Sequence, residues 1–271
     1  MSDEETLKDP IIEHSFSSSE PDTSHIISKK RKRKGVENVK KAAKKHKRKN
    51  LDEDEDIDVE NNLNKAFARM DSQLLSDYLA QLTRRFEKDL SSLELEDKYL
   101  KAASIADSTN WDRPRNLENY PGFLEKFAEN TTKLWSASKK QGAPHTIIIA
   151  NSGLRAADIV RCLKRFPIKE AKIAKLFAKH IKIQEAAQFL QNNRTGIAVG
   201  TPQRLEDLIE KGVLKTSVVK RIVIDASHID QKRRGILEMR ETYAPLMTLL
   251  GRKEFRNKYE AESDKIHLLF Y

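Results

Sequence analysis

The sequence is poor in several kinds of residue, and each shortage excludes a class of protein. Cys162 is its only cysteine, which excludes an internal disulfide or a cysteine-rich zinc site and is typical of a reducing compartment. No apolar run approaches the roughly 18 residues that a membrane-spanning helix requires. The first apolar pair, Ile11-Ile12, lies among acids and serines and does not form a signal peptide. We therefore expect a soluble, intracellular protein with no membrane contact.

Catalytic motifs are missing as well. The sequence contains no GxSxG, HExxH or CxxC motif, so the usual nucleophile, zinc-protease and dithiol sites are not expected. It also lacks a GxxxxGKS or GxxxxGKT loop, whose glycine amides and lysine would hold nucleotide phosphates. Before Ile147, Gly122 stands alone, and residues 139–144 have one glycine and no lysine-threonine ending. These absences predict no catalytic residue, no cofactor and no metal ion.

Residues 1–60 are predicted to be a disordered tail. They contain no tryptophan or tyrosine and one phenylalanine, too little apolar surface to offset the entropy lost on folding. Their charge is divided into −6 over residues 1–28, +12 over 29–50 and −7 over 51–60. The acidic run from Asp52 to Glu60 either masks the basic residues or binds basic ribosomal proteins.

Two dense basic clusters lie in the middle block of the tail. Their spacing is typical of a bipartite nuclear import signal, and their density favours retention in RNA-rich compartments. We therefore expect import receptors among the partners and localisation to the nucleus and nucleolus. The alternative is a merely solvated tail. The clusters consist of Lys29, Lys30, Arg31, Lys32, Arg33 and Lys34, followed by Lys44, Lys45, Lys47, Arg48 and Lys49.

Residues 61–271 are expected to fold, and they carry a net charge of +11. A basic folded domain attracts phosphate backbones, although lysine-rich solubility would give the same charge. Within it, apolar residues recur every three or four positions from Asn61 to Ala106, which predicts one long helix or two stacked ones. A turn-rich connection over 107–122 leads to a second amphipathic helix expected from about Gly122 to Lys140. This helical region, 61–140, completes the predicted fold or docks on neighbours.

From residue 146 the chain alternates between apolar, β-branched runs and amphipathic segments. Strands are predicted over 146–150, 196–200, 218–225 and 266–270, and helices over 154–165, 185–192, 204–211 and 232–251. Residues 173–179 fit a helix or a strand. Strands that alternate with helices pair in parallel, so the predicted fold is α/β, a three-layer sandwich around a parallel sheet.

Three segments of this alternation resemble motifs of the first RecA-like domain of DEAD-box RNA helicases. The run from Ile147 to Ala156 resembles motif Ia, and the run from Val199 to Leu205 is similar to motif Ib. A helix N-terminus beside an arginine also suits a phosphate group on physical grounds, although an ordinary capped helix has the same pattern. The resemblance implies RNA contact by Arg155, Thr201, Gln203 and Arg204.

The third segment, Asp225-Ala226-Ser227-His228, stands where the resemblance places the acidic motif II. In those helicases the first aspartate helps to hold magnesium and the next glutamate positions the attacking water. Ala226 replaces that glutamate and cannot act on a water, and we interpret His228 as a turn residue rather than a metal ligand. Leu268 to Tyr271 resembles the strand before motif III, and no second RecA-like lobe is expected. The resemblance therefore implies a lobe that does not hydrolyse ATP.

The run from Lys175 to Lys182, together with the motif Ib-like and motif II-like segments, resembles one particular family. Its members are subunits of the early, small-nucleolar-RNA-containing pre-ribosome (the small-subunit processome), with a degenerate helicase-like domain. The resemblance covers about residues 61–271 and implies a nucleolar assembly factor. Its implied partners are pre-rRNA or small nucleolar RNA and the assembly proteins of that particle.

The function predicted from the sequence is therefore a non-catalytic factor of ribosome biogenesis that binds RNA, proteins or both. The two alternatives are a divergent ATP-dependent RNA helicase and a pure protein–protein adaptor of the nucleolus. Supporting positive charge for RNA contact is expected from Arg161, Lys164, Lys172, Lys175, Lys179, Lys232, Arg233 and Arg234.

Overall fold

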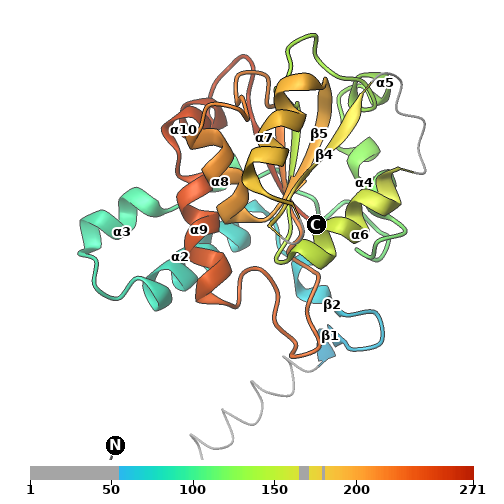
Figure 1. Cartoon of the computed structure of the whole chain (residues 1–271). Coiled ribbons are helices and arrows are strands. Elements are labelled where there is room, and N and C mark those ends of the chain that lie inside the picture. The colour runs from blue at the N-terminus through green and yellow to red at the C-terminus, as the bar shows by residue number, and fades with distance from the viewer. Residues whose placement is uncertain (1–54, 165–170, 179–180) are drawn as a thin grey trace, which may run out of the picture. The chain divides into compact units, whose positions relative to one another are not determined.

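The computed structural model describes residues 55–164, 171–178 and 181–271 (Figure 1). The basic clusters 29–34 and 44–49, and Lys179, lie outside the described residues. In the part that is described, no helix combines the length and apolar character needed to cross a bilayer.

The centre of the fold is a five-stranded parallel sheet of order β4-β5-β3-β6-β7. Its strands are β3 (Thr146–Ile149), β4 (Lys172–Leu176), β5 (Thr195–Gly200), β6 (Arg221–Ile224) and β7 (His267–Phe270). Every residue of β3, β5 and β6 is buried, as expected for strands covered on both faces. The predicted α/β fold is confirmed. The segment 173–179, which fitted a helix or a strand, overlaps strand β4.

Side chains that alternate along the strands divide the core into two halves. Ile147 and Ile149 belong to one half, where they pack with α2, α7, α8, α9 and α10. Ile148 belongs to the other half and packs with α4, α5 and α6. Because neighbouring strand residues point to opposite faces, helices cover both faces of the sheet and the fold has three layers (Figure 1).

Of the helices that follow strands, those after β3, β4 and β5 begin close to their predicted positions, whereas the one after β6 begins later than predicted. They are α6 (Gly153–Leu163), α7 (Ile183–Asn192), α8 (Pro202–Glu210) and α9 (Arg240–Leu250). The Ser152 hydroxyl caps α6 by accepting from the backbone N–H of Arg155 at 3.3 Å. Thr201 is the N-cap of α8 and Pro202 its first residue, but the Thr201 side chain makes no capping bond.

The prediction of one or two long helices over 61–106 was wrong in part. The segment contains β2 (Leu63–Asn64), the 3-10 helix η1 (Lys65–Ala68), α2 (Ser72–Phe86), α3 (Ser92–Lys98) and the 3-10 helix η2 (Ala102–Ser104). Asp71 and Ser91 interrupt the apolar periodicity because each accepts a backbone N–H as an N-cap. Strand β1 (Ile57–Asp58) pairs antiparallel with β2 and lies inside the range predicted to be tail.

Two further helix boundaries differ from those predicted. The helix expected over 122–140 is two short ones, α4 (Tyr120–Lys126) and α5 (Thr131–Leu134), because Asn130 caps a new start. The helix expected over 232–251 begins only at Arg240, because the Asp230 carboxylate binds the backbone N–H groups of the following loop. One helix, α10 (Lys253–Tyr259), was not predicted.

Leu75 and Leu93 provide a test of this packing, since both are leucines in helices of the segment 61–106. Leu75 is 0% exposed and Leu93 is 70% exposed. We expect Leu75→Ala to lower the free energy of unfolding by about 2–5 kcal/mol, because it leaves a cavity in the core. We expect Leu93→Ala to change it by less than about 0.5 kcal/mol. Urea denaturation of the two variants measures the difference, and equal losses would contradict the packing.

Candidate nucleic-acid interface

The loops that follow the strands meet at the carboxyl edge of the sheet, where open α/β folds bind ligands. Asn151 and Ser152 follow β3, Thr201 follows β5, and Asp225 follows β6. Most of the residues that the sequence singled out therefore lie along one edge. Their exposure differs widely, and it decides what each can contact.

Arg155 and Asp225 form a buried ion pair at this edge. Arg155 Nε donates to Asp225 Oδ2 at 2.7 Å, and Nη2 donates to Oδ1 at 3.0 Å. Arg155 is 6% exposed and Asp225 is 1% exposed. The pair joins α6 to the end of β6, two elements far apart in the sequence. We expected Arg155 to contact RNA, but its guanidinium points inward to a carboxylate instead of outward to solvent.

The charge of the Arg155 guanidinium follows from its surroundings. Burial opposes the charge on Arg155, but the neighbouring Asp225 carboxylate raises the pKa of the guanidinium above its ordinary value. Both carboxylate oxygens accept hydrogen bonds from Arg155. Asp225, the acid that the helicase resemblance assigns to magnesium, is therefore paired with a cation from its own chain.

The rest of the motif II-like segment is covered by the start of the folded region. Ala226 is 0% exposed and Ser227 is 2% exposed. The backbone N–H of Asn64 donates to Ser227 O at 2.7 Å, and Leu63 forms an antiparallel bridge with His228. Burial lowers the pKa of His228. Among the described residues, no group of three His, Cys, Asp or Glu side chains is arranged to hold a metal ion.

The motif Ib-like residues lie at the start of α8 and are more accessible. Gln203 is exposed, and its Nε2 donates to Asp207 Oδ1 at 2.9 Å. Arg204 is half-buried, and its Nη1 donates to the carbonyl oxygen of Ile181 at 3.0 Å. Thr201 is also half-buried. These three residues remain candidates for contact with a phosphate backbone.

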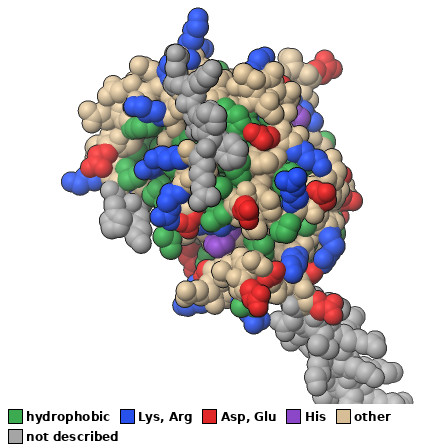
Figure 2. All heavy atoms as spheres, turned by 90° about the vertical axis from the view of Figure 1, so that its right-hand side faces the viewer, with side chains coloured by type: hydrophobic (Ala, Val, Ile, Leu, Met, Phe, Trp, Pro, Cys, Tyr) green, Lys and Arg blue, Asp and Glu red, His purple; other side chains and the backbone are tan. Residues whose placement is uncertain are grey.

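The supporting basic residues do not form one cluster. Arg161 and Lys164 end α6, and Lys172 begins β4, so all three lie toward the amino edge of the sheet. Arg161 is paired with Asp158 on its own helix. Lys175 is exposed within β4, and Figure 2 shows acidic side chains spread among the Lys and Arg side chains of one face. The structure thus separates the charges that we expected to act together.

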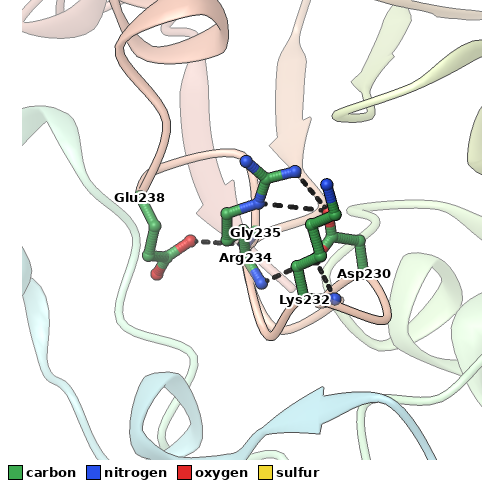
Figure 3. A network of polar contacts seen from close by, with 5 residues as sticks. All are labelled: Asp230, Lys232, Arg234, Gly235 and Glu238. Carbon is green, nitrogen blue, oxygen red and sulfur yellow. Dashed lines mark hydrogen bonds and ion pairs between the residues drawn. The ribbon is translucent and has the colours of Figure 1, made fainter.

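The basic loop 230–238 follows the carboxyl edge after β6 (Figure 3). Asp230 organises it by accepting from the backbone N–H of Lys232 at 2.8 Å and of Arg234 at 2.9 Å. The Arg234 guanidinium also binds Asp230, at 3.1 Å, and Glu238 accepts from the Gly235 N–H at 2.7 Å. The loop therefore has a defined shape and presents Lys232, Arg233 and Arg234 as exposed side chains.

A surface depression of about 660 Å³ lies between this loop and α6. Its lining includes Asn151, Arg155, His228, Lys232 and Arg234. Asn151 Oδ1 and His228 Nδ1 are buried and accept or donate no hydrogen bond within the described part of the chain. A polar hollow with basic residues on one side suits a phosphate group or a polar ligand edge.

Sequence reasoning missed two features of this region. It gave no role to β2, because a two-residue strand has no periodic signal. It also passed over Arg115, which is 3% exposed and donates from Nη2 to Ser108 O at 3.1 Å. The only available signal was an arginine inside the turn-rich segment 107–122.

The fold and the site together define the class of protein. It is a parallel α/β domain in which the acid at the carboxyl edge of the sheet, Asp225, pairs with an arginine of the same domain, Arg155. A family model described as the U3-containing 90S pre-ribosomal complex subunit, CMS1, matches residues 12–271, and the chain belongs to this family.

The chain is also similar to curated proteins that are named CMS1 or CMSS1. Protein CMS1 of Chaetomium thermophilum is 57% identical over 246 residues, which are 91% of this chain and 98% of that protein. Protein cms1 of Schizosaccharomyces pombe is 30% identical over 192 residues, 71% of this chain and 68% of that protein. Protein CMSS1 of Homo sapiens is 30% identical over 179 residues, 66% of this chain and 59% of that protein.

The buried ion pair can be tested by a double-mutant cycle. Arg155→Met leaves the Asp225 carboxylate buried without a partner, so we expect a loss of about 3–5 kcal/mol in the free energy of unfolding. The double variant Arg155→Met/Asp225→Asn should recover part of that loss, with a coupling energy above about 1 kcal/mol. Denaturant titrations of the wild type, both single variants and the double variant provide the measurement.

Arg161→Met is the matched control on the same helix. Its partner is Asp158 and its own side chain is 71% exposed, so we expect a change below about 1 kcal/mol. Strict additivity of the Arg155 and Asp225 substitutions would show that the pair does not hold the edge together.

Proposed function

We propose that the protein is a non-catalytic component of the early small-subunit pre-ribosome that contacts pre-rRNA through a helicase-like lobe. The observation that carries the proposal is the buried pair between Arg155 and Asp225, at 2.7 and 3.0 Å. It supports a lobe that keeps its ligand-binding edge without the machinery for ATP hydrolysis. The family's description as a subunit of a U3-containing 90S pre-ribosomal complex supports the particle.

The absence of catalysis is supported by chemistry at three positions. The carboxylate that would bind magnesium is paired with Arg155, and Ala226 has no group that can orient a water. The sequence also lacks a phosphate loop with the required glycines and lysine. The competing hypothesis of a divergent helicase requires a different phosphate site and a different acid.

Direct contact with RNA is supported by the accessible groups of the carboxyl edge. Gln203 and Arg204 lie at the start of α8, where the helix dipole favours anions. Lys232 adds an exposed ammonium on the loop held by Asp230. These accessible groups are few and lie far apart. We therefore infer that the protein binds RNA with a modest, salt-sensitive affinity and does not recognise its base sequence.

The tail and the lobe have separate roles in this proposal. Residues 1–60 carry the basic clusters and deliver the protein to the nucleus and nucleolus through import receptors. Residues 61–271 form the helicase-like domain, with 61–140 as its helical region. In the described structure β1, at 57–58, already pairs with β2, so we propose that the boundary lies a few residues before 61.

A purely protein-binding role is favoured by one observation on α2 and α3. No residue of α3 is buried, and Leu74 and Leu93 are 51% and 70% exposed. Figure 1 shows these helices at the side of the lobe, away from the edge strand β4 and its neighbour β5. Exposed leucines on a projecting helical pair suit a protein partner.

RNA binding by the full chain tests the proposed function. We expect a short unstructured RNA to bind with an affinity that falls steeply as salt rises. Lys232→Ala and Arg204→Ala should each weaken binding and reduce the slope of log K against log salt by about one unit. Fluorescence anisotropy over a range of salt concentrations measures both quantities.

Lys139→Ala is the matched control, because Lys139 is exposed and lies before β3, toward the amino edge. It should leave the affinity and the slope unchanged. Binding that is insensitive to salt, or equally weakened by all three substitutions, would reject the carboxyl edge as the RNA-binding surface and favour the protein-binding role.

A further inference from the structure

A second hollow, which we name the Arg115 pocket, lies beside the carboxyl ends of β6 and β7. It has a volume of about 380 Å³ and is lined by residues of 58–69, by residues 111–116 and by Ser227. It shares no lining residue with the depression beside the loop 230–238. None of Thr201, Gln203, Arg204 and Lys232 lines it. Its properties are therefore independent of the proposed RNA-binding surface.

The lining of the pocket includes a buried cation, Arg115, without a carboxylate partner. Arg115 is 3% exposed, and its hydrogen bonds go to the neutral acceptors Phe270 O, Ser108 O and Ser108 Oγ. Among the ion pairs of the described residues, none involves Arg115. The Asp107 carboxylate raises the pKa of Arg115 at a distance, but it is exposed and accepts hydrogen bonds from Thr109.

Arg115 remains charged at neutral pH despite its surroundings. Burial lowers the pKa of the guanidinium to about 10, still far above neutrality. A buried charge is costly when no opposite charge compensates for it. The uncompensated charge of Arg115 therefore points to a bound anion that completes the site.

Three residues of the pocket carry buried polar atoms that lack a hydrogen-bond partner in the described structure. They are Arg115 Nε, Trp111 Nε1 and Ser227 Oγ. The first two only donate, and the hydroxyl can rotate to donate as well. Buried donors are almost always satisfied in folded proteins, so three in one pocket indicate a missing acceptor.

The mouth of the pocket adds further positive charge. Its lining contains Lys65, Arg69, Arg113 and Arg115 against Asp58 and Asp112. Lys65 is paired with Asp58 at 3.0 Å and Arg69 with Asp56, so these two cations are partly neutralised. The Arg113 guanidinium instead lies 5.9 Å from the centre of the Trp111 ring. An anion that enters would meet Arg113 first and Arg115 at the base.

We propose that the Arg115 pocket binds the phosphate group of a small phosphorylated ligand. A phosphate is an acceptor at every oxygen, so it matches a site rich in donors, and arginine is suited to it by geometry and charge. A volume of about 380 Å³ is within the range of small-molecule sites. The faces of Trp111 are approached by the cations Arg113 and Lys126, so the recognised part is the phosphate rather than a stacked ring.

Tryptophan fluorescence of the full chain tests this proposal directly. The chain has two tryptophans, so Trp135→Phe leaves Trp111 as the only reporter. Titration with inorganic phosphate should change its emission in a saturable manner, and the same additions should raise the melting temperature. Potassium chloride at equal ionic strength should do neither.

Two substitutions locate the binding, each with a matched control. Ser227→Ala and Arg113→Ala should each weaken phosphate binding about tenfold, since each removes a donor or a charge that faces the anion. Thr195→Val removes another buried hydroxyl without a partner, and Arg240→Ala another exposed arginine, both outside the pocket lining. The controls should bind phosphate like the parent.

A comparison of ligands shows whether the pocket recognises the phosphate group alone or also the rest of a phosphorylated ligand. Adenosine monophosphate that binds as tightly as inorganic phosphate, while adenosine does not bind, would support recognition of the phosphate alone. A phosphate response no larger than that to chloride would overturn the proposal. So would unchanged affinity in Ser227→Ala and Arg113→Ala. Because none of these variants alters the carboxyl-edge residues Arg204 and Lys232, RNA binding can succeed or fail separately.

Discussion

The paired hydrogen bonds between Arg155 and Asp225 are the constraint on which the candidate site depends. Asp225 is fixed at the end of β6, where its backbone N–H also donates to Ile149 O at 3.0 Å. A carboxylate held at that depth requires a cation, and α6 supplies one. The arginine cannot then reach solvent, so the same interaction that stabilises the edge removes one residue from its surface. The motif Ia-like arginine and the motif II-like acid therefore bind each other inside the fold.

The start of the folded region covers the same edge. Asn64 donates to Ser227 O, and Leu63 pairs with His228, so β2 lies against the loop that follows β6. On the other side Arg115 binds the last carbonyl of β7. The carboxyl edge is consequently divided into two hollows, of about 660 and 380 Å³. One adjoins the basic loop, and the other contains a buried, uncompensated arginine.

The sequence predicted the sheet and its flanking helices well where the local signal was strong. Runs such as 147–149 and 222–224 are apolar and β-branched, and Thr201-Pro202 is a local signal of a helix start. The segment 61–140 was harder, because its apolar stripe continues through the caps at Asp71 and Ser91. Burial in that segment is decided by distant residues; Tyr243, for example, hydrogen-bonds Thr83 at 2.8 Å from another helix.

The site was less predictable than the fold for the same reason. A motif indicates which residue types stand near the edge, but the direction of Arg155 depends on an acid 70 positions later. Local sequence likewise gave no sign that Arg115 lacks a carboxylate, because that absence is a property of the folded neighbourhood. Only the three-dimensional structure shows which arginines face solvent and which are buried beside acids or carbonyl groups.

This separation changes how the net charge should be interpreted. Residues 61–271 carry +11, yet Arg115 and Arg221 are buried, and acids are spread among the surface cations (Figure 2). The whole charge acts at long range, where it steers polyanions toward the lobe. Fewer charges can touch a phosphate, so a single RNA contact surface would hold weakly. Several weak contacts with one particle together give a high affinity. A protein with few accessible charges on each surface therefore suits an assembly in which RNA, neighbouring proteins and a basic tail each contribute part of the affinity.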